Sequence, residues 1–290
     1  MTSDPSTAAT GPGSTHAETS VGRKRTDIDF AEPNRANGLR LLLDRHLPPL
    51  KEGDPLPPLW HWTYFWEQAA QSRLAEDGHA LRGDFLPASD LAQRMWAGSE
   101  VVWQAPLRLG EIWHRESVIE AVTPKDGRSG RLLFVTVRHE IESGGRPCLT
   151  ERQSIVYREA TRPGTASPKP RPAPDEPLWQ RRVMPDSRLL FRYSALTFNA
   201  HRIHYDAAYA RRVEGYPALV VHGPLLATMM VDLVLRERPG AELQSFSFRA
   251  IAPVLSSRAL RICGLPRDDS VRVWVETSGG MAMDGVMTMA

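Results

Sequence analysis

The segment that most constrains the fold is the apolar stretch GPLLATMMVDLVLRERPG at residues 223–240. Pro224 suits the first turn of a helix and Gly240 suits its end, so the segment predicts a single helix. Its central part, PLLATMMVDLVL, is apolar on almost every side of such a helix. A helix of this kind requires nearly complete burial, and a curved sheet wrapped around it is the economical way to provide that burial.

Strand-like segments follow this helix and can form such a sheet. They alternate in polarity or carry β-branched and aromatic residues, and turn residues separate them. They cover residues 242–253, 257–265, 270–277 and 285–289. The second half of the chain therefore predicts one buried helix followed by a meander of antiparallel strands.

An earlier block of the chain has the same order of elements. Residues 63–78 carry apolar residues at helical spacing and predict a helix that ends near Gly78. Strand-like segments rich in Val, Ile and Trp follow at residues 99–109, 111–123, 131–143 and 148–158. In addition, EVVWQAPL at 100–107 resembles SFRAIAPV at 247–254, because in each an alternating strand runs into Ala-Pro and an aliphatic residue. The shared order and this match favour an internal duplication.

A proline-rich connector at residues 160–186 divides the two blocks, because it can form neither a regular helix nor a central strand. We therefore expect a disordered tail at residues 1–26, a first block at 27–159 and a second block at 187–290. The predicted fold class is α+β. It consists of two antiparallel sheets, each wrapped around a central helix and related by a pseudo-twofold axis, which pair into one continuous surface.

Charge and cysteine content restrict the functional class. A formal net charge of +2 predicts binding neither to nucleic acid nor to a membrane through a basic face. No apolar run reaches the roughly twenty residues of a membrane span, and residues 1–25 lack the apolar core of a secretory signal. Cys148 and Cys263 stand far apart without metal-binding spacing. We therefore expect a cytoplasmic protein with two reduced, buried thiols.

A dense polar cluster lies just before the apolar helix. Asn199, His201, Arg202 and His204 fall within six positions, and Gly223 stands at the predicted helix start. Histidine exchanges protons near neutral pH because its ordinary pKa is about 6.5. The first N–H groups of a helix favour negative charge, and glycine lets a ligand approach closely. This combination suits acyl transfer or hydration.

These residues resemble the signature of the MaoC-like, hydratase-2 branch of the hot-dog fold. That signature runs aromatic, small, Asp-x-Asn-Pro-x-His, with a later His-Gly that opens a helix. Here the sequence reads YSA at 193–195, NAHRIH at 199–204 and HG at 222–223. FNAHRIHYD at 198–206 is similar to the subgroup of mesaconyl-C4-CoA and itaconyl-CoA hydratases and mitochondrial-type hydroxyacyl-thioester dehydratases. PLWHW at 58–62 and RMWAG at 94–98 extend the likeness into the first block.

The resemblance implies a double hot-dog enzyme that reversibly hydrates an enoyl-CoA to a 3-hydroxyacyl-CoA, without metal or redox cofactor. The expected substrate is a short dicarboxylyl-CoA such as mesaconyl-C4-CoA or itaconyl-CoA. His204 occupies the position of the catalytic histidine and is the expected general base, and the amide of Gly223 would receive the thioester oxygen. The first block lacks the Asn/His cluster, so we expect it to supply tunnel wall only. The alternatives are a general dehydratase of fatty acid metabolism and a non-catalytic acyl-thioester-binding protein.

Two positions depart from the family pattern, because Asn199 replaces its Asp and His201 replaces its Asn. Asn199 cannot transfer a proton. Either it orients the water while His204 makes the transfers, which we prefer, or His201 and His204 divide them. Asp206 orienting a histidine is a third option. A plain turn, in which Asn199 bonds its own backbone, is about as well supported.

Further residues are candidates for substrate binding: Tyr193, Arg202, His222 and Arg249. A dicarboxylyl substrate needs a guanidinium for its free carboxylate, so Arg202 is the first candidate and Arg249 the second. For His222, packing at the helix start is a better prediction than catalysis.

Other functional classes stay open. His201, His204 and His222 match the histidine count of a catalytic zinc site, although the chain has no HExxH motif. A thioesterase on the same fold is disfavoured, because no nucleophilic carboxylate lies near the helix start. A duplicated chain can act as a monomer or as a homodimer of double units.

Overall fold

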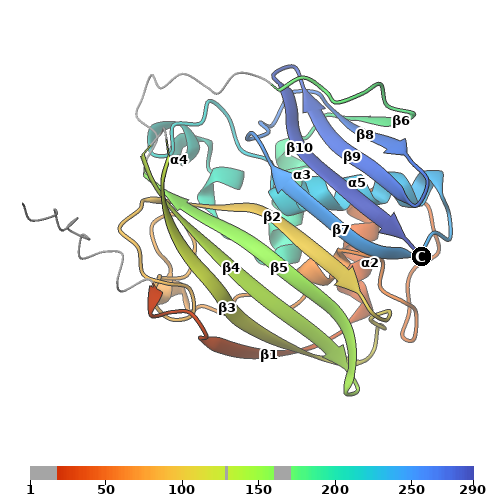
Figure 1. The fold of residues 1–290 in the computed structure, drawn as a ribbon, viewed down its shortest axis with the longest axis horizontal. Coiled ribbons are helices and arrows are strands. Elements are labelled where there is room, and N and C mark those ends of the chain that lie inside the picture. The colour runs from red at the N-terminus through yellow and green to blue at the C-terminus, as the bar shows by residue number, and fades with distance from the viewer. Residues whose placement is uncertain (1–17, 128–129, 160–170) are drawn as a thin grey trace, which may run out of the picture.

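The computed structural model describes residues 18–127, 130–159 and 171–290. Ten strands form one sheet in the order β1-β3-β4-β5-β2-β7-β10-β9-β8-β6 (Figure 1). The first half contributes β1 (Lys24–Phe30), β2 (Gln93–Trp103), β3 (Ile112–Gly127), β4 (Gly130–Ser143) and β5 (Arg146–Arg158). The second half contributes β6 (Trp179–Val183), β7 (Leu243–Ala250), β8 (Leu260–Pro266), β9 (Ser270–Thr277) and β10 (Gly280–Met289).

The two halves of the sheet join at β2 and β7, which pair antiparallel. In this ladder Glu100 lies opposite Ser247. These are the first residues of the two segments that match each other in the sequence, so each copy faces its counterpart across a local twofold axis. The predicted fold class and the predicted continuous sheet are confirmed.

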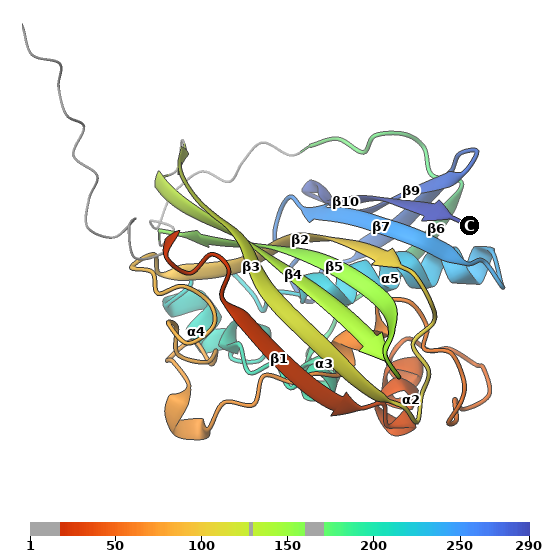
Figure 2. The ribbon, with the colours of Figure 1, turned by 60° about the horizontal axis from the view of Figure 1, so that its bottom comes forward.

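The α-helices that lie wholly within the described residues are α2 (Pro33–Leu42), α3 (Ser187–Thr197), α4 (Ala207–Arg212) and α5 (Gly223–Glu237). The sheet curves over them, and α5 runs beneath the strands of the second half (Figure 2). Every residue of α5 from Leu225 to Val234 is buried, as its all-round apolar sequence requires. Among the described residues, no helix is long and apolar enough to cross a bilayer.

The helix predicted over residues 63–78 is wrong. This part of the chain is irregular except for short 3-10 turns at Trp60–Thr63 and Gln71–Arg73. Tyr64 and Phe65 are both buried, but Phe65 adopts a left-handed φ of 53°, which a right-handed helix does not contain. Within the described residues the first half therefore has no long buried helix equivalent to α5.

Two predicted boundaries also differ from the structure. Strand β1 begins at Lys24, inside the predicted tail, and β6 lies inside the predicted connector of residues 160–186. β6 pairs with β8 at the edge of the sheet, which is where a strand beside a proline-rich segment is tolerated. Residues 1–17 of the predicted tail and 160–170 of the connector lie outside the described residues.

Candidate active site

The polar cluster lies in the connection between α3 and α5. Helix α3 ends because Phe198 adopts a left-handed conformation with a φ of 51°. Asn199 then forms a turn, in which its Oδ1 accepts a hydrogen bond from the N–H of His201 at 2.9 Å. The side-chain oxygen of Asn199 is thus engaged by the backbone, as the turn interpretation of this residue supposed.

One ring nitrogen of His204 lies in a hydrogen bond, and the other has no hydrogen-bond partner among the described residues. Its Nδ1 lies 2.7 Å from the carbonyl oxygen of Val220. A carbonyl can only accept, so Nδ1 carries the proton and Nε2 keeps its lone pair. Burial lowers the pKa of His204 from 6.5 to about 4, so the ring is neutral at pH 7. His204 can therefore accept a proton at Nε2.

His222 supports the ring of His204. The two rings stack with centroids 3.7 Å apart, and Nε2 of His222 lies 2.9 Å from Oγ of Ser194. His222 is fully buried, and burial followed by the charges of His204 and His201 lowers its pKa well below the ordinary value. Its geometry is that of a packing residue at the helix start.

Gly223 begins α5 and lines the cleft. Within the described residues no backbone or side-chain group accepts a hydrogen bond from it. A Cβ at this position would lie 3.9 Å from the ring of Trp96, so the site stands against that tryptophan. The unpaired N–H and the helix dipole together favour a negatively charged oxygen.

An open cleft of about 2920 Å³ connects these groups. Among the predicted site residues, those that line it are His204, Asn199, His201, Gly223 and Tyr193. The first half contributes residues as well, among them Trp62, His79, Arg94 and Trp96. The cleft is therefore built from both halves of the chain.

The two arginines predicted to bind a substrate carboxylate do not line the cleft. Arg202 pairs with Asp206 at 2.7 Å and also donates to the carbonyl of Glu76. Arg249 pairs with Asp284 at 3.4 Å, and its side chain is 63% exposed. Each guanidinium is held by a neighbouring carboxylate outside the cleft. The four-residue spacing of Arg202 and Asp206 allows such a pair, whereas the sequence does not reveal the pair of Arg249 and Asp284. Asp206 in turn caps α4, so it does not orient a histidine.

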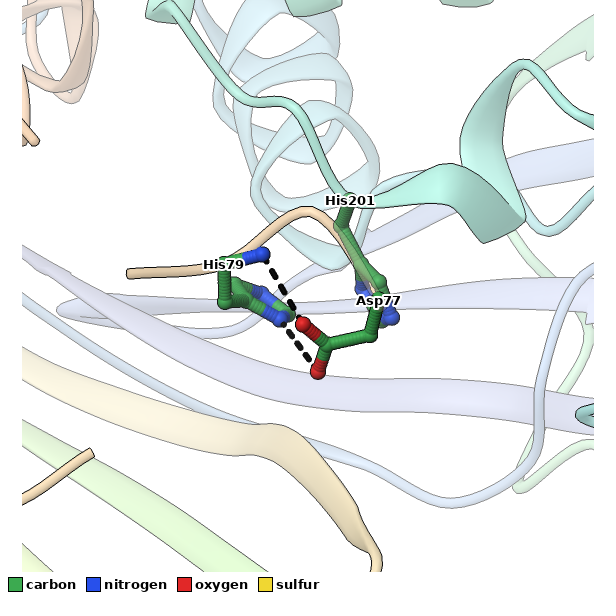
Figure 3. Close-up of side chains that lie close together, drawn as sticks. All are labelled: Asp77, His79 and His201. Carbon is green, nitrogen blue, oxygen red and sulfur yellow. Dashed lines mark hydrogen bonds and ion pairs between the residues drawn. The ribbon is translucent and has the colours of Figure 1, made fainter. Parts of the chain in front are cut away.

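Sequence reasoning missed a second polar group, Asp77 and His79, in the loop that replaces the predicted helix. Nδ1 of His79 lies 3.1 Å from Oδ2 of Asp77, and its backbone N–H donates to Oδ1 at 2.9 Å (Figure 3). The ring of His79 lies 4.1 Å from that of His201, whose ring is 5.4 Å from that of His204. The available signal was the Asp-Gly pair at 77–78, which is typical of a turn and therefore indicates a loop at His79.

This loop is docked tightly against the motif segment. Gly78 has a φ of +93°, and a Cβ there would lie 1.9 Å from the carbonyl oxygen of Ala200. The carbonyl of Asp77 accepts a hydrogen bond from the N–H of Arg202 at 2.9 Å. Only glycine permits this approach, so residue 78 fixes Asp77 and His79 beside the motif.

Asp77, His79 and His201 are spaced as metal ligands can be, since their ligand atoms lie within 4.8 Å of one another. Both carboxylate oxygens of Asp77, however, already accept hydrogens from His79. The predicted zinc set is engaged too, because Nδ1 of His204 bonds Val220 and Nε2 of His222 bonds Ser194. The arrangement is that of hydrogen-bonded imidazoles.

A separate buried network surrounds Glu151 on the first-half side of the cleft. Its carboxylate bonds His61, Trp62, Ser99 and Gln153. Burial tends to raise the pKa of Glu151, but the hydrogen bond and charge of His61 outweigh it and lower the pKa to about 2. With four partners this carboxylate is fully engaged, and we regard it as structural.

Comparison with protein families places these residues in a known context. A family model described as hydroxyacyl-thioester dehydratase type 2 matches residues 59–256, which include both Asp77 and the motif. The Chloroflexus aurantiacus protein named mesaconyl-C(4)-CoA hydratase is 48% identical over 228 residues, or 78% of this chain and 79% of that protein.

Solved structures agree on the fold. A MaoC-like dehydratase from Phytophthora capsici aligns with a TM-score of 0.72 at 13% identity, covering 95% of this chain and 98% of that one. A Mycobacterium tuberculosis protein described as having a double hot-dog fold aligns with a TM-score of 0.59 at 14% identity, covering 96% and 98%. At these identities the likeness concerns the fold alone, which is a double hot-dog.

Proposed function

The chain belongs to the hydroxyacyl-thioester dehydratase type 2 family, and from this premise we propose that it hydrates a short dicarboxylyl-CoA of the mesaconyl-C4-CoA type. It is a hydro-lyase that hydrates and dehydrates CoA thioesters. One observation carries the residue assignment. Nε2 of His204, with a free lone pair, shares a cleft with the unpaired N–H of Gly223.

In this proposal His204 moves the proton and Gly223 holds the charge. Nε2 of His204 takes a proton from water while the water oxygen bonds the β-carbon. The electron pair of the double bond moves to the α-carbon and the thioester oxygen, which accepts the N–H of Gly223 at the α5 terminus. The imidazolium of His204 then protonates the α-carbon and returns to its neutral form. His222 and Tyr193 are assigned to packing around the reacting groups.

The guanidinium for the free carboxylate is, in this proposal, Arg94 in place of Arg202 or Arg249. Arg94 lies on β2 and lines the cleft. Burial and then the charge of Arg94 lower the pKa of His79, so the guanidinium stands close to the histidines. Within the described residues Arg94 forms no ion pair, which leaves its charge for a ligand. In mesaconyl-C4-CoA the carboxylate is on the carbon that receives the water, so a cation is needed there.

A substrate panel tests this proposal: mesaconyl-C4-CoA, itaconyl-CoA, crotonyl-CoA and a long-chain enoyl-CoA. We expect the highest kcat/KM with a dicarboxylyl-CoA. Arg94→Gln should then raise KM for that substrate by about tenfold or more, the scale of one charge-assisted contact, and leave crotonyl-CoA unchanged. An equal effect on both substrates would remove Arg94 from carboxylate recognition. Binding without turnover on the whole panel would instead favour a non-catalytic thioester-binding protein.

A general 3-hydroxyacyl-thioester dehydratase is the second candidate, and the size of the cleft favours it. Its volume of about 2920 Å³ exceeds what a four-carbon acyl group needs, even with part of CoA. The first half lacks a long buried helix in its described residues, which leaves room beside β2. Preference for the long-chain enoyl-CoA in the same panel would select this candidate.

We also propose that the protein is cytoplasmic and that the two halves of the chain have different roles. Cys148 and Cys263 are free and buried, which fits a reducing compartment such as the cytoplasm. The second half would carry the motif and the first half the opposite wall of the cleft. The substrate is the proposed partner, and a homodimer of double units is one assembly to test by light scattering.

A further inference from the structure

The family pattern pairs a histidine with an aspartate, yet Asn199 stands where the aspartate is expected. Asn199 cannot accept a proton, and its Oδ1 already holds the N–H of His201. The motif segment alone therefore offers one oriented imidazole, His204, and no carboxylate that faces the cleft. A second group that holds the attacking water in position raises the rate of hydration.

The loop of the first half delivers such a group. His79 lines the cleft, whereas Asp77 does not. The carboxylate of Asp77 therefore contacts the imidazole of His79 on the side away from the cleft. Burial tends to raise the pKa of Asp77, but the hydrogen bond and charge of His79 outweigh it, and the carboxyl stays ionised. An ionised carboxylate accepts the proton of Nδ1, which leaves the lone pair on Nε2 of His79.

We propose that His79, oriented by Asp77, is a second catalytic residue of the hydration, supplied by the first half in place of the aspartate that Asn199 replaces. This inference rests on the proposed function. His79 acts as a catalytic residue because it touches the reacting water, and Asp77 is a positioning residue.

In the proposed step the water lies between two neutral imidazoles, those of His204 and His79, and every proton is accounted for. One O–H of the water breaks and its proton passes to Nε2 of His204, while the oxygen bonds the β-carbon. The other O–H stays intact and donates to Nε2 of His79 throughout, so His79 ends the step neutral. His204 returns its proton to the α-carbon, and the net change is the addition of one water.

The docking of the two loops supports a role in catalysis beyond simple packing. Gly78 stands between Asp77 and His79 and allows contact with Ala200 that no other residue permits. The ring of His201 lies 4.1 Å from that of His79 and 5.4 Å from that of His204. Three imidazoles from two halves of the chain thus meet at one wall of the cleft.

The test compares His79→Ala and Asp77→Asn with a matched control, His139→Ala. His139 is another first-half histidine that lines the cleft, but it is buried and its Nδ1 lies 2.7 Å from Oγ of Ser117. We expect His79→Ala to lower kcat on the order of a hundredfold, with KM within about threefold of wild type. Asp77→Asn should lower kcat about tenfold at unchanged KM, and His139→Ala should keep kcat within about threefold.

Chemical rescue separates catalysis from structure. Free imidazole in the buffer should restore at least about a tenth of wild-type kcat to His79→Ala, because the cleft is open, and should not affect His139→Ala. Full activity of His79→Ala, or a loss that imidazole does not change, would overturn the inference. Stoichiometric zinc whose chelation abolishes activity would overturn it as well. An inactive wild type would instead refute the proposed function.

Discussion

Replacing Gly78 with alanine should damage catalysis far more than it damages stability. The new Cβ would lie 1.9 Å from the carbonyl oxygen of Ala200, whereas real Cβ contacts stay above 3.0 Å. The two loops must therefore separate by about 1.1 Å, and the loop that moves carries Asp77 and His79. A displacement of about 1 Å in an active site can cost on the order of a hundredfold in rate. We expect kcat to fall by that order.

Gly83→Ala is the matched control for this substitution. Gly83 lies in the same connection with a φ of +110°, but the nearest heavy atom to its Cβ would be 4.0 Å away. Both alanines carry the cost of a left-handed conformation, about 1–2 kcal/mol, which corresponds to a few degrees in Tm. Only Gly78→Ala adds the clash.

Steady-state hydration kinetics and thermal melts on the two variants decide the question. Loss of kcat in Gly78→Ala alone supports the docked loop, and the extra fall in its Tm relative to Gly83→Ala measures what the clash costs in stability. If Gly78→Ala retains wild-type kcat, the contact between this loop and the motif does not position catalytic groups, and the reasoning fails.

Further predictions concern the second half. His204→Gln should lower kcat about a hundredfold or more in the hydration assay, because glutamine cannot accept the proton, and an active variant would remove His204 from that role. The rate should hold down to about pH 5 and fall below it, because burial lowers the pKa of His204 from 6.5 to about 4 and only the neutral ring is a base. The folded chain then binds fewer protons than the unfolded chain, so the stability that this histidine contributes is complete above pH 6.5 and is lost as the pH falls through about 4, which melts against pH would measure. Ser194→Ala leaves Nε2 of His222 without its 2.9 Å partner and should cost about 1–3 kcal/mol of unfolding free energy, measured by denaturant titration.

The sequence by itself determined the features that depend on neighbours along the chain. An all-round apolar stretch at residues 223–240 had to be a buried helix, and the strands after it had to cover it. The residues of the motif are close in sequence, so His204 and Gly223 could be selected together. The match between residues 100–107 and 247–254 likewise indicated the duplication, whereas the structure placed the junction of the two halves at β2 and β7.

Only the tertiary structure decided which distant groups join this site and which charges are free. Apolar spacing over residues 63–78 imitated a helix, because burial of consecutive aromatic residues depends on the surfaces they meet. For the same reason the sequence did not reveal that Asp77 and His79 contact the motif. Arg202 and Arg249 are paired with Asp206 and Asp284, while Arg94 is not ion-paired among the described residues. The Arg202–Asp206 pair joins residues four apart, which the sequence allows for. The Arg249–Asp284 pair joins two strands that meet only in three dimensions, and spacing along the chain does not encode it.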